Sequence, residues 1–388
     1  MIFFFWLCLF IVVYTFVGYG AMLFVLVKIK RLLYGKKNAS YITGQLPSLT
    51  LVVAAYNEAD IIEEKIHNTL SLTYPADKIK YIFITDGSVD ETPGRISLYP
   101  TIQLMHATER KGKINAIHRA MQQVDTDITV FTDANTSLNE DALVNIARHY
   151  ANKKVGAVSG EKRVKITDVS DATAGEGFYW KYESQLKKWD SELCSVVGAA
   201  GELFSIRTNL YQPVSADTIL DDFMISLKIA AKGYTIVYEP NAFAVENASA
   251  NTKEELKRKI RIAAGGMQSI LRLKSLFNFF RHPVLSFQYI SHRVLRWTVT
   301  PFLMIITLLL NIFIVLQHNI FIYSFLLAGQ ILFYGLAVAG WFLEMKEIKI
   351  KPFFIPFYFC LMNYAVIMGI GRFFANNQQA AWEKAKRK

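Results

Sequence analysis

The sequence predicts an α/β domain that lies between apolar segments of membrane-spanning length. Strand-like apolar runs alternate with helical patterns from about residue 48 to residue 159, which is typical of βαβ units. Apolar residues form 52% of the 388-residue chain and gather at the N-terminus and in the last quarter. The middle of the chain therefore has the mixed composition of a soluble domain, and its two ends have the composition of membrane segments.

The N-terminal segment 1–27 is expected to be a membrane anchor. It carries no charged side chain and is about long enough to cross the hydrocarbon core of a bilayer. It has neither the basic start nor the small-residue cleavage site of a signal peptide, so we expect it to be retained. Lys28, Lys30 and Arg31 follow at once, and the positive-inside rule then places the next region, a domain over residues 45–265, in the cytosol.

The C-terminal part of the chain is expected to be multi-pass, in the inner or plasma membrane. Its apolar stretches lie near residues 297–316, 320–343 and 352–374, within a membrane region over 296–375. An interfacial amphipathic region is expected at 266–295 and a basic cytosolic tail at 376–388.

The side of the membrane that the C-terminus faces stays open. One anchor followed by three spans would leave the C-terminus outside, whereas the basic tail argues for the cytosol. Two solutions remain. Either segment 352–374, which contains Pro352 and Pro356, is re-entrant or broken, or region 266–295 alters the count of spans.

The net charge of +11 indicates lipid partners and not nucleic acid. The basic residues lie largely beside the apolar segments, where anionic lipid attracts them, and no nucleic-acid-binding motif accompanies them. Cys8, Cys194 and Cys360 form neither a disulfide framework nor a zinc site, which agrees with a reducing cytosol.

Polar residues close the predicted strands of the soluble domain. Asn57 and Glu58 follow the strand at 48–56, Asp86 follows 81–85, and Asp133 follows 127–132. Ligands of such sheets bind beyond the carboxyl ends of the strands, so these residues are the candidates for chemistry. Asp86 could accept a hydrogen bond from a uracil N–H or a ribose hydroxyl, and an ordinary turn is equally compatible with Asp86-Gly87-Ser88.

Two acidic motifs and one basic motif follow. Asp133-Ala134-Asn135 favours a ligand for Mg²⁺ or Mn²⁺ beside a nucleotide diphosphate over a helix cap. Asp221-Asp222 favours a general base over a helix cap. A basic helix is expected over 252–273, with Thr252 and Glu255 spaced as a capping box. Its Arg258 and Arg261 share one face, where they either hold a diphosphate or form a solvated basic surface.

The order of these motifs resembles a known family. The chain is similar to processive-type family 2 glycosyltransferases, the group that includes hyaluronan, cellulose and poly-N-acetylglucosamine synthases. The resemblance runs through Val53-Ala54-Ala55-Tyr56-Asn57-Glu58, Asp86-Gly87-Ser88-Val89-Asp90, Lys111-Gly112-Lys113-Ile114-Asn115-Ala116, Thr132-Asp133-Ala134-Asn135, Gly201-Glu202-Leu203-Phe204-Ser205-Ile206-Arg207, Leu220-Asp221-Asp222-Phe223, Arg258 to Arg261, and Trp382-Glu383-Lys384-Ala385-Lys386-Arg387.

The resemblance implies a Rossmann-like GT-A fold, a UDP-sugar donor and a role for each candidate residue. The nucleoside would contact Tyr56, Glu58 and Asp86. Mg²⁺ or Mn²⁺ would bind Asp133, with Asn135 as the second ligand. Asp222 would be the base of an inverting displacement, and the donor diphosphate and substrate would be held by Lys113, Asp221, Arg258 and Arg261.

Two positions depart from the family pattern. Asn135 stands where a second acid is usual, which implies weaker metal binding or a role for Asp133 alone. Ile262 stands where the family's tryptophan typically stacks against the acceptor sugar, which argues against long-chain processivity.

The sequence therefore predicts transfer from a UDP-sugar to a saccharide or lipid-linked acceptor at the membrane, in cell-surface or extracellular polysaccharide synthesis. A polyprenyl-phosphate sugar transferase is the second interpretation. A non-catalytic scaffold subunit, favoured by Asn135 and Ile262, is the third.

Overall fold

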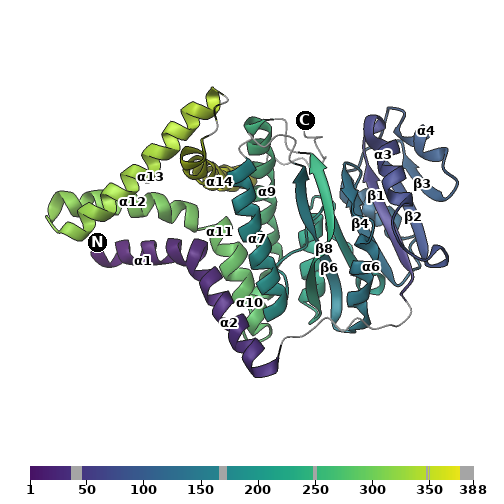
Figure 1. The fold of residues 1–388 in the computed structure, drawn as a ribbon, viewed down its shortest axis with the longest axis horizontal. Helices are drawn as coiled ribbons and strands as arrows, with labels where there is room; N and C mark the ends of the chain where they lie inside the picture. Colours follow the sequence, from purple (N-terminus) through teal and green to yellow (C-terminus); the bar gives the residue numbers. More distant parts are fainter. Residues whose placement is uncertain (36–45, 166–172, 248–250, 347, 349, 376–388) are drawn as a thin grey trace.

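The computed structural model describes residues 1–35, 46–165, 173–247, 251–346, 348 and 350–375. The predicted Trp382 motif and the basic tail at 376–388 lie outside these residues. Among the described residues, a mixed sheet forms one half of the molecule and long helices form the other (Figure 1).

The sheet has eight strands in the order β3-β2-β1-β4-β7-β6-β8-β5. Strands β3, β2, β1 and β4 are parallel, β7 is antiparallel to both β4 and β6, β8 is parallel to β6, and β5 is antiparallel to β8. The strands are β1 (Leu49–Ala55), β2 (Ile79–Asp86), β3 (Ile102–Ala107), β4 (Ile128–Asp133), β5 (Thr136–Leu138), β6 (Val155–Lys165), β7 (Leu203–Arg207) and β8 (Thr235–Asn247).

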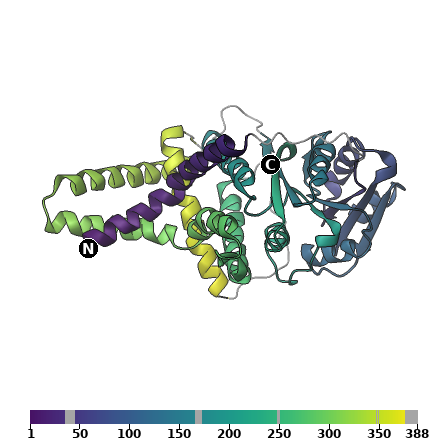
Figure 2. The ribbon, with the colours of Figure 1, turned by 90° about the horizontal axis from the view of Figure 1, so that it is seen from below.

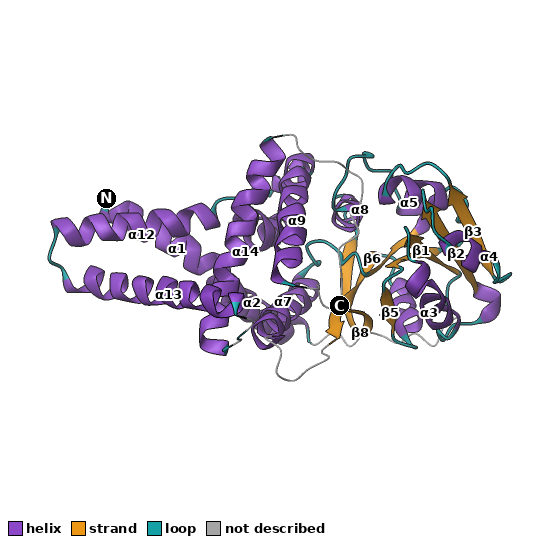
Figure 3. Cartoon of the chain, turned by 90° about the horizontal axis from the view of Figure 1, so that it is seen from above, coloured by secondary structure: helices purple, strands orange, loops and turns teal. Residues whose placement is uncertain are grey.

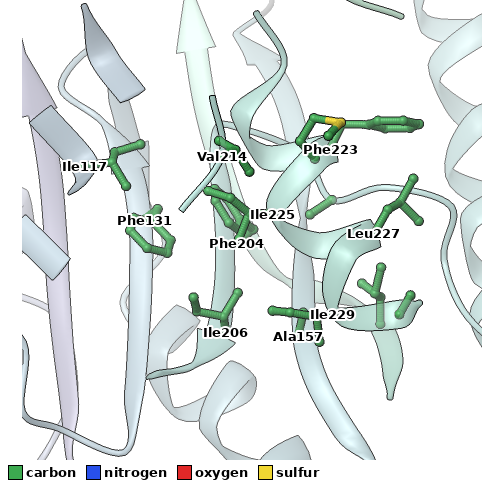
Figure 4. Close-up of a cluster of buried hydrophobic side chains, with 14 of the residues drawn as sticks. Ile117, Phe131, Ala157, Phe204, Ile206, Val214, Phe223, Ile225, Leu227 and Ile229 are labelled. Atoms are coloured by element: carbon green, nitrogen blue, oxygen red, sulfur yellow. The ribbon is translucent and has the colours of Figure 1, made fainter. Parts of the chain in front are cut away.

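Helices cover both faces of the sheet. They are α3 (Ala59–Leu70), α4 (Thr92–Ser97), α5 (Lys113–Met121), α6 (Ala142–Ala147), α7 (Thr173–Leu193) and α8 (Asp221–Ala230), and α9 (Thr252–Arg272) lies farther out, against α14. Strand β1 is buried along its whole length because its alternate side chains enter two separate cores. One core receives α5 and α8, including Ile117, Phe131, Phe204 and Ile225 (Figure 4), and the other receives α3, α4 and α6.

Four helices of the described chain are long and apolar enough to cross a membrane. The first runs from Ile2 to Tyr34 as α1 (Ile2–Val13), a π-helical segment Tyr14–Gly18 and α2 (Tyr19–Tyr34), so it continues past the predicted end at residue 27. The others are α12 (Thr300–Gln317), α13 (Phe321–Met345) and α14 (Lys351–Phe374), close to the predicted stretches.

These four helices do not share one direction. Helices α1, α12 and α13 extend side by side away from the sheet, whereas α14 crosses them and lies along α9 (Figures 2 and 3). The approach of α14 to α9 is close, because a Cβ atom on Gly369 would come within 2.5 Å of the Ala263 Cβ atom and 2.8 Å of the Ile260 carbonyl oxygen. Helix α14 is continuous through Pro356.

The end of α2 is fixed to the soluble domain through α7. Lys30 donates to the backbone carbonyls of Glu192 and Leu193 at 2.8 and 2.7 Å. Arg31 forms a forked ion pair with the Glu192 carboxylate at 2.5 and 2.6 Å. Two of the basic residues predicted to lie beside the membrane therefore also dock the first apolar helix onto the domain.

The segment from residue 266 to residue 299 begins inside α9 and continues through α10 (Pro283–Tyr289), a π-helical segment Ile290–Val294 and α11 (Leu295–Trp297). Exposed apolar side chains lie here, with Phe280 fully exposed. The predicted capping box is wrong. The N-cap of α9 is Asn251, whose side chain accepts from the Glu254 backbone N–H at 2.9 Å, and Thr252 bonds Glu344 instead.

Candidate active site

A cavity of about 1200 Å³ lies beyond the carboxyl ends of β1 and β4, against the start of α8 and the first half of α9. This is the edge at which the strand-end residues were expected to meet. Nine of the ten predicted site residues line the cavity, namely Tyr56, Glu58, Lys113, Asp133, Asn135, Asp221, Asp222, Arg258 and Arg261.

Asp86 is the exception. Its Oδ2 atom accepts from the backbone N–H groups of Lys111 and Gly112 at 3.0 and 2.6 Å, and it lines a small recess that Tyr56 and Lys113 also line. Gly112 has φ +93°, in the left-handed region that favours glycine, and it is the N-cap of α5. Asp86 therefore fixes the loop that delivers Lys113 to the cavity.

The turn after β1 shapes the neighbouring wall. Asn57 has φ +51°, and its side-chain oxygen accepts from the Val89 backbone N–H at 2.9 Å, which ties this turn to the loop after β2. The Tyr56 ring faces the Arg110 guanidinium, whose carbon lies 3.9 Å from the ring centroid. The sequence prediction did not single out Arg110.

Lys113 is the electrostatic centre of the cavity. Its Nζ atom lies 2.6 Å from Asp133 Oδ1 and 3.8 Å from Asp221 Oδ2. Burial acts to lower the pKa of Lys113, but the charges of Asp133 and Asp221 outweigh it and raise the pKa, so the ammonium stays charged. Burial raises the pKa of Asp133, although Lys113 opposes that rise.

Asp222 lies in the first turn of α8, beside Gly201. A Cβ atom on Gly201 would come within 3.2 Å of Asp222 Oδ2, so the glycine leaves this carboxylate room. Burial and the charge of neighbouring Asp221 raise the pKa of Asp222 to about 7, against the opposing effect of Lys113. A carboxylate with such a pKa can take up a proton near neutral pH.

The residues at the end of β4 fit a divalent cation that shares its ligands with a diphosphate. Asp133 presents a carboxylate to the cavity and Asn135 lies on the same wall. Among the described residues, no group of three or more His, Cys, Asp or Glu side chains could hold a metal alone. Mg²⁺ is commonly held by one or two carboxylates together with substrate phosphates, and this donor set has that form.

The basic residues of α9 are held by acids. Arg258 forms a forked pair with Glu255, with both N–O distances 3.0 Å, and lies 3.7 Å from Glu246. These acids and burial orient the guanidinium at the cavity wall. The role of Arg258 and Arg261 in holding a diphosphate stays a prediction.

Further residues of the cavity were missed by the sequence prediction. Glu202 lines it and pairs with buried Lys162 at 2.5 Å, an interaction that helps to keep the pKa of Glu202 low although burial would raise it. Buried Lys65 donates to the Thr136 carbonyl at 2.7 Å, and burial lowers the pKa of Lys65 to about 7. Glu202 lies in the motif that begins Gly201-Glu202-Leu203, so its place in that motif could have identified it as a candidate site residue.

Arg372 reaches the same cavity from α14, so the C-terminal apolar helix contributes to the site. A second cavity of about 840 Å³ adjoins the first, and six residues line both: Asp133, Glu202, Leu220, Asp222, Arg258 and Ile262. Ile262 therefore lies at the junction where the family pattern has tryptophan.

Comparisons with known proteins agree with this geometry. Residues 50–213 match the family described as "Glycosyl transferase family 2". Poly-beta-1,6-N-acetyl-D-glucosamine synthase of Staphylococcus aureus strain MSSA476 is 28% identical over 238 residues, which are 59% of this chain and 57% of that protein. The synthase of Staphylococcus epidermidis is 26% identical with the same coverage. The chain thus matches somewhat more than half the length of these curated relatives.

A solved structure shares the fold. The mannosyltransferase PcManGT from Pyrobaculum calidifontis, in complex with GDP-Man and Mn²⁺, superposes with a TM-score of 0.72 at 22% identity, covering 97% of this chain and 100% of that one. The fold is therefore of the GT-A type, as predicted. Residues 50–213 thus match a glycosyl transferase family 2 domain, and the fold of the chain agrees with that match.

Proposed function

We propose that the chain is an inverting transferase that moves a sugar from UDP to a hydroxyl group of a saccharide or lipid-linked acceptor. The acceptor oxygen forms a bond to the anomeric carbon while the bond from that carbon to the diphosphate oxygen breaks. The diphosphate leaves with the electron pair, and the proton of the acceptor hydroxyl passes to the Asp222 carboxylate.

One observation carries this proposal: Asp222 lines both cavities. A base in a displacement must reach the acceptor hydroxyl while the donor lies on the opposite side of the reacting oxygen. A carboxylate on the wall common to a polar cavity and a separate second cavity meets that need. Lys113, which lines the polar cavity, supplies a positive charge for the leaving diphosphate.

Asp133, with Asn135, would hold Mg²⁺ or Mn²⁺ in that cavity. When bound, the cation would offset the negative charge of the diphosphate as it leaves. Tyr56 and Glu58 lie at the end of β1 on the same wall, and we assign them to the nucleoside. Asp86 would act on the nucleoside from the adjoining recess that Tyr56 shares.

A hydroxyl acceptor agrees with the charges better than the phosphate of a polyprenyl carrier does. A phosphate oxygen is already anionic, so it needs no base. Of the residues that line both cavities, Asp133, Glu202 and Asp222 are acidic and Arg258 is basic, so their junction is less favourable for an anionic acceptor. We therefore rank the polyprenyl-phosphate transferase second.

We place the reaction at the cell membrane, with the catalytic domain in the cytosol. The N-terminus and the connection between α12 and α13 lie together at the end farthest from the sheet (Figure 1). If α1, α12 and α13 span the bilayer and α14 lies along its surface, the C-terminus shares the side of the domain. Helix α14 is continuous, so segment 352–374 is not broken, but in this arrangement it is not a simple span either, and the conflict with the basic tail is removed.

The likeness to poly-N-acetylglucosamine synthases favours a role in cell-surface polysaccharide synthesis. The donor is tested by release of nucleotide from UDP-N-acetylglucosamine, UDP-glucose, UDP-glucuronate and GDP-mannose, each with Mg²⁺, with Mn²⁺ and with EDTA. We expect turnover of a UDP-sugar that EDTA abolishes. Turnover of GDP-mannose alone would overturn the UDP assignment, and turnover of no donor would overturn the enzyme proposal.

The raised pKa of Asp222 predicts a pH dependence. Below about pH 7 the carboxyl group is neutral and cannot accept a proton, so kcat/KM should fall about tenfold for each further pH unit. Above its pKa the carboxylate is charged and this loss disappears. The measurement is kcat/KM for transfer from about pH 5 to about pH 9, and a flat acid limb would contradict the prediction.

A further inference from the structure

The second cavity has walls of a different kind from the first. Part of its lining comes from Phe16, Val17, Ala21 and Phe24 on the first apolar helix. The opposite part comes from α14, where the lining residues are Ile355, Tyr358, Phe359, Met362, Asn363, Ala365 and Val366. Both helices are among those long and apolar enough to cross a membrane. The cavity therefore extends from Asp222, the candidate base, to the apolar surfaces of these two helices.

The charged groups that line this cavity are largely engaged with one another. Glu183 pairs with Arg293 at 2.8 Å and with Arg296 at 3.0 Å. Lys162 pairs with Glu202 at 2.5 Å. The Asn363 side chain donates to the Phe359 carbonyl of its own helix at 2.9 Å. Among the lining residues that the first apolar helix and α14 contribute, only Tyr358 and Asn363 carry a polar side-chain group.

The tryptophans around the cavity already have neighbours on their rings. Trp180 has Lys162 and Lys259 at 5.5 and 5.4 Å from its ring centroid. Trp189 contacts Phe24, with the ring centroids 5.5 Å apart, and Trp297 contacts Phe223 at 5.3 Å. A long saccharide needs open aromatic faces and hydrogen-bond partners for its hydroxyls, because unpaired hydroxyls are costly in apolar surroundings. The lining tryptophans lie outside the first apolar helix and α14, and the walls formed by these two helices carry few hydrogen-bonding side chains.

We propose that the second cavity holds the apolar tail of a lipid acceptor, whose hydroxyl-bearing head lies at Asp222 and whose chain lies between α2 and α14. The proposal rests on the proposed transfer reaction and names its acceptor class. The bond changes and the proton acceptor are those given above. Ile262 at the junction of the cavities then contacts the tail side of the head group instead of stacking against a further sugar.

The first apolar helix and α14 contact each other at the wall of this tail site. The rings of Phe16 and Phe359 are in edge contact, with centroids 4.6 Å apart, and both line the cavity. On the α2 side, a Cβ atom on Gly20 would come within 2.6 Å of the Tyr182 hydroxyl oxygen, so a small residue there keeps α2 close to α7. Apolar side chains of this kind can bind a hydrocarbon chain, because the hydrophobic effect has no directional requirement.

The test compares acceptors that share a head group and differ only in their tail. Methyl and octyl β-glycosides of glucose and of N-acetylglucosamine are assayed below their critical micelle concentrations, beside a free tetrasaccharide. Each buried methylene group strengthens binding about fourfold, so we expect kcat/KM to rise about 10²-fold from methyl to octyl if about half of the added methylene groups are buried, and about 10⁴-fold if all are. Equal values for the two tails, or a tetrasaccharide better than the octyl glycoside, would overturn the proposal.

Hydrolysis of the donor in the absence of an acceptor, measured as nucleotide release, distinguishes failure of the lipid-acceptor proposal from failure of the proposed transferase function. Release from a UDP-sugar with no tail preference contradicts the lipid acceptor alone, whereas no release from any donor contradicts the proposed function itself.

A pair of variants on α14 locates the tail site. Met362→Trp fills part of the cavity and should bring the octyl-to-methyl ratio of kcat/KM toward one. Met368 is 43% exposed on the same helix and is not a lining residue, so Met368→Trp should keep the wild-type ratio. Because each ratio is taken within one protein, partial loss of folded enzyme does not affect it. An unchanged ratio in Met362→Trp would place the tail elsewhere and overturn the site.

Discussion

Asp222→Asn is expected to lower sugar transfer by about 10²- to 10⁴-fold, the range that general-base catalysis commonly contributes. Asparagine keeps the size of the side chain but cannot accept a proton. The expected loss lies in kcat, because the change removes an interaction made as the acceptor is deprotonated. Binding of UDP, measured by calorimetry with Mg²⁺, should survive. Wild-type transfer in this variant would exclude Asp222 as the base.

Burial of Asp222 predicts that the Asp222→Asn variant stays folded, so misfolding does not account for the loss of activity. The folded protein raises the pKa of Asp222 to about 7 by burial, so ionised Asp222 destabilises the fold at pH values above its normal pKa. A neutral asparagine removes that cost, and the melting temperature should be equal or higher. Asp125→Asn is the matched control, because Asp125 is an exposed partner of Lys80 and should change neither activity nor stability.

The strand-end part of the site could be predicted because it depends on local pattern. The β-branched residues of β1 are buried in the two cores on either side of the sheet. Because β1 and β4 are parallel, Asn57, Glu58 and Asp133 lie at the same edge of the sheet. Asp222 followed from two acids at the start of a helix. Asp86 shows the limit of such reasoning, since its carboxylate fixes the Lys111–Gly112 loop and lies in the adjoining recess.

The second cavity could not be predicted in this way. It exists because α14 lies across the other apolar helices and along α9, which depends on the close approach of Gly369 to Ala263, 106 residues away in sequence. The same contact brings Arg372 to the donor side. Hydropathy identifies α14 as apolar but contains no information about its direction. The antiparallel strand β7 likewise depends on long-range pairing with β4.

Glu183→Gln is expected to lower the stability of the folded protein by about 3–5 kcal/mol, because it removes one partner of a buried ion cluster. Glu183 accepts from Arg293 and Arg296, and His292 Nε2 lies 3.3 Å from it. Those cations lower the pKa of Glu183 well below its normal value although burial would raise it. Without the carboxylate, the buried guanidinium of Arg296 and the largely buried one of Arg293 lose their counter-charge, and we expect a clear fall in melting temperature in detergent.

The cluster matters for function because it joins the domain to the apolar helices. Asp190 lies on the same face of α7 as Glu183, about two helical turns further along. It accepts a hydrogen bond from Tyr19 of α2 and one from Gln288 at 2.9 Å, and it lies 2.6 Å from His292 Nδ1. Glu192→Gln is the matched control, since the Glu192–Arg31 pair is partly exposed and should cost less than about 1 kcal/mol. If both variants lose equally little, the buried cluster does not hold α2, α7 and α11 together. If only Glu183→Gln lowers the melting temperature, the walls of the second cavity depend on this cluster.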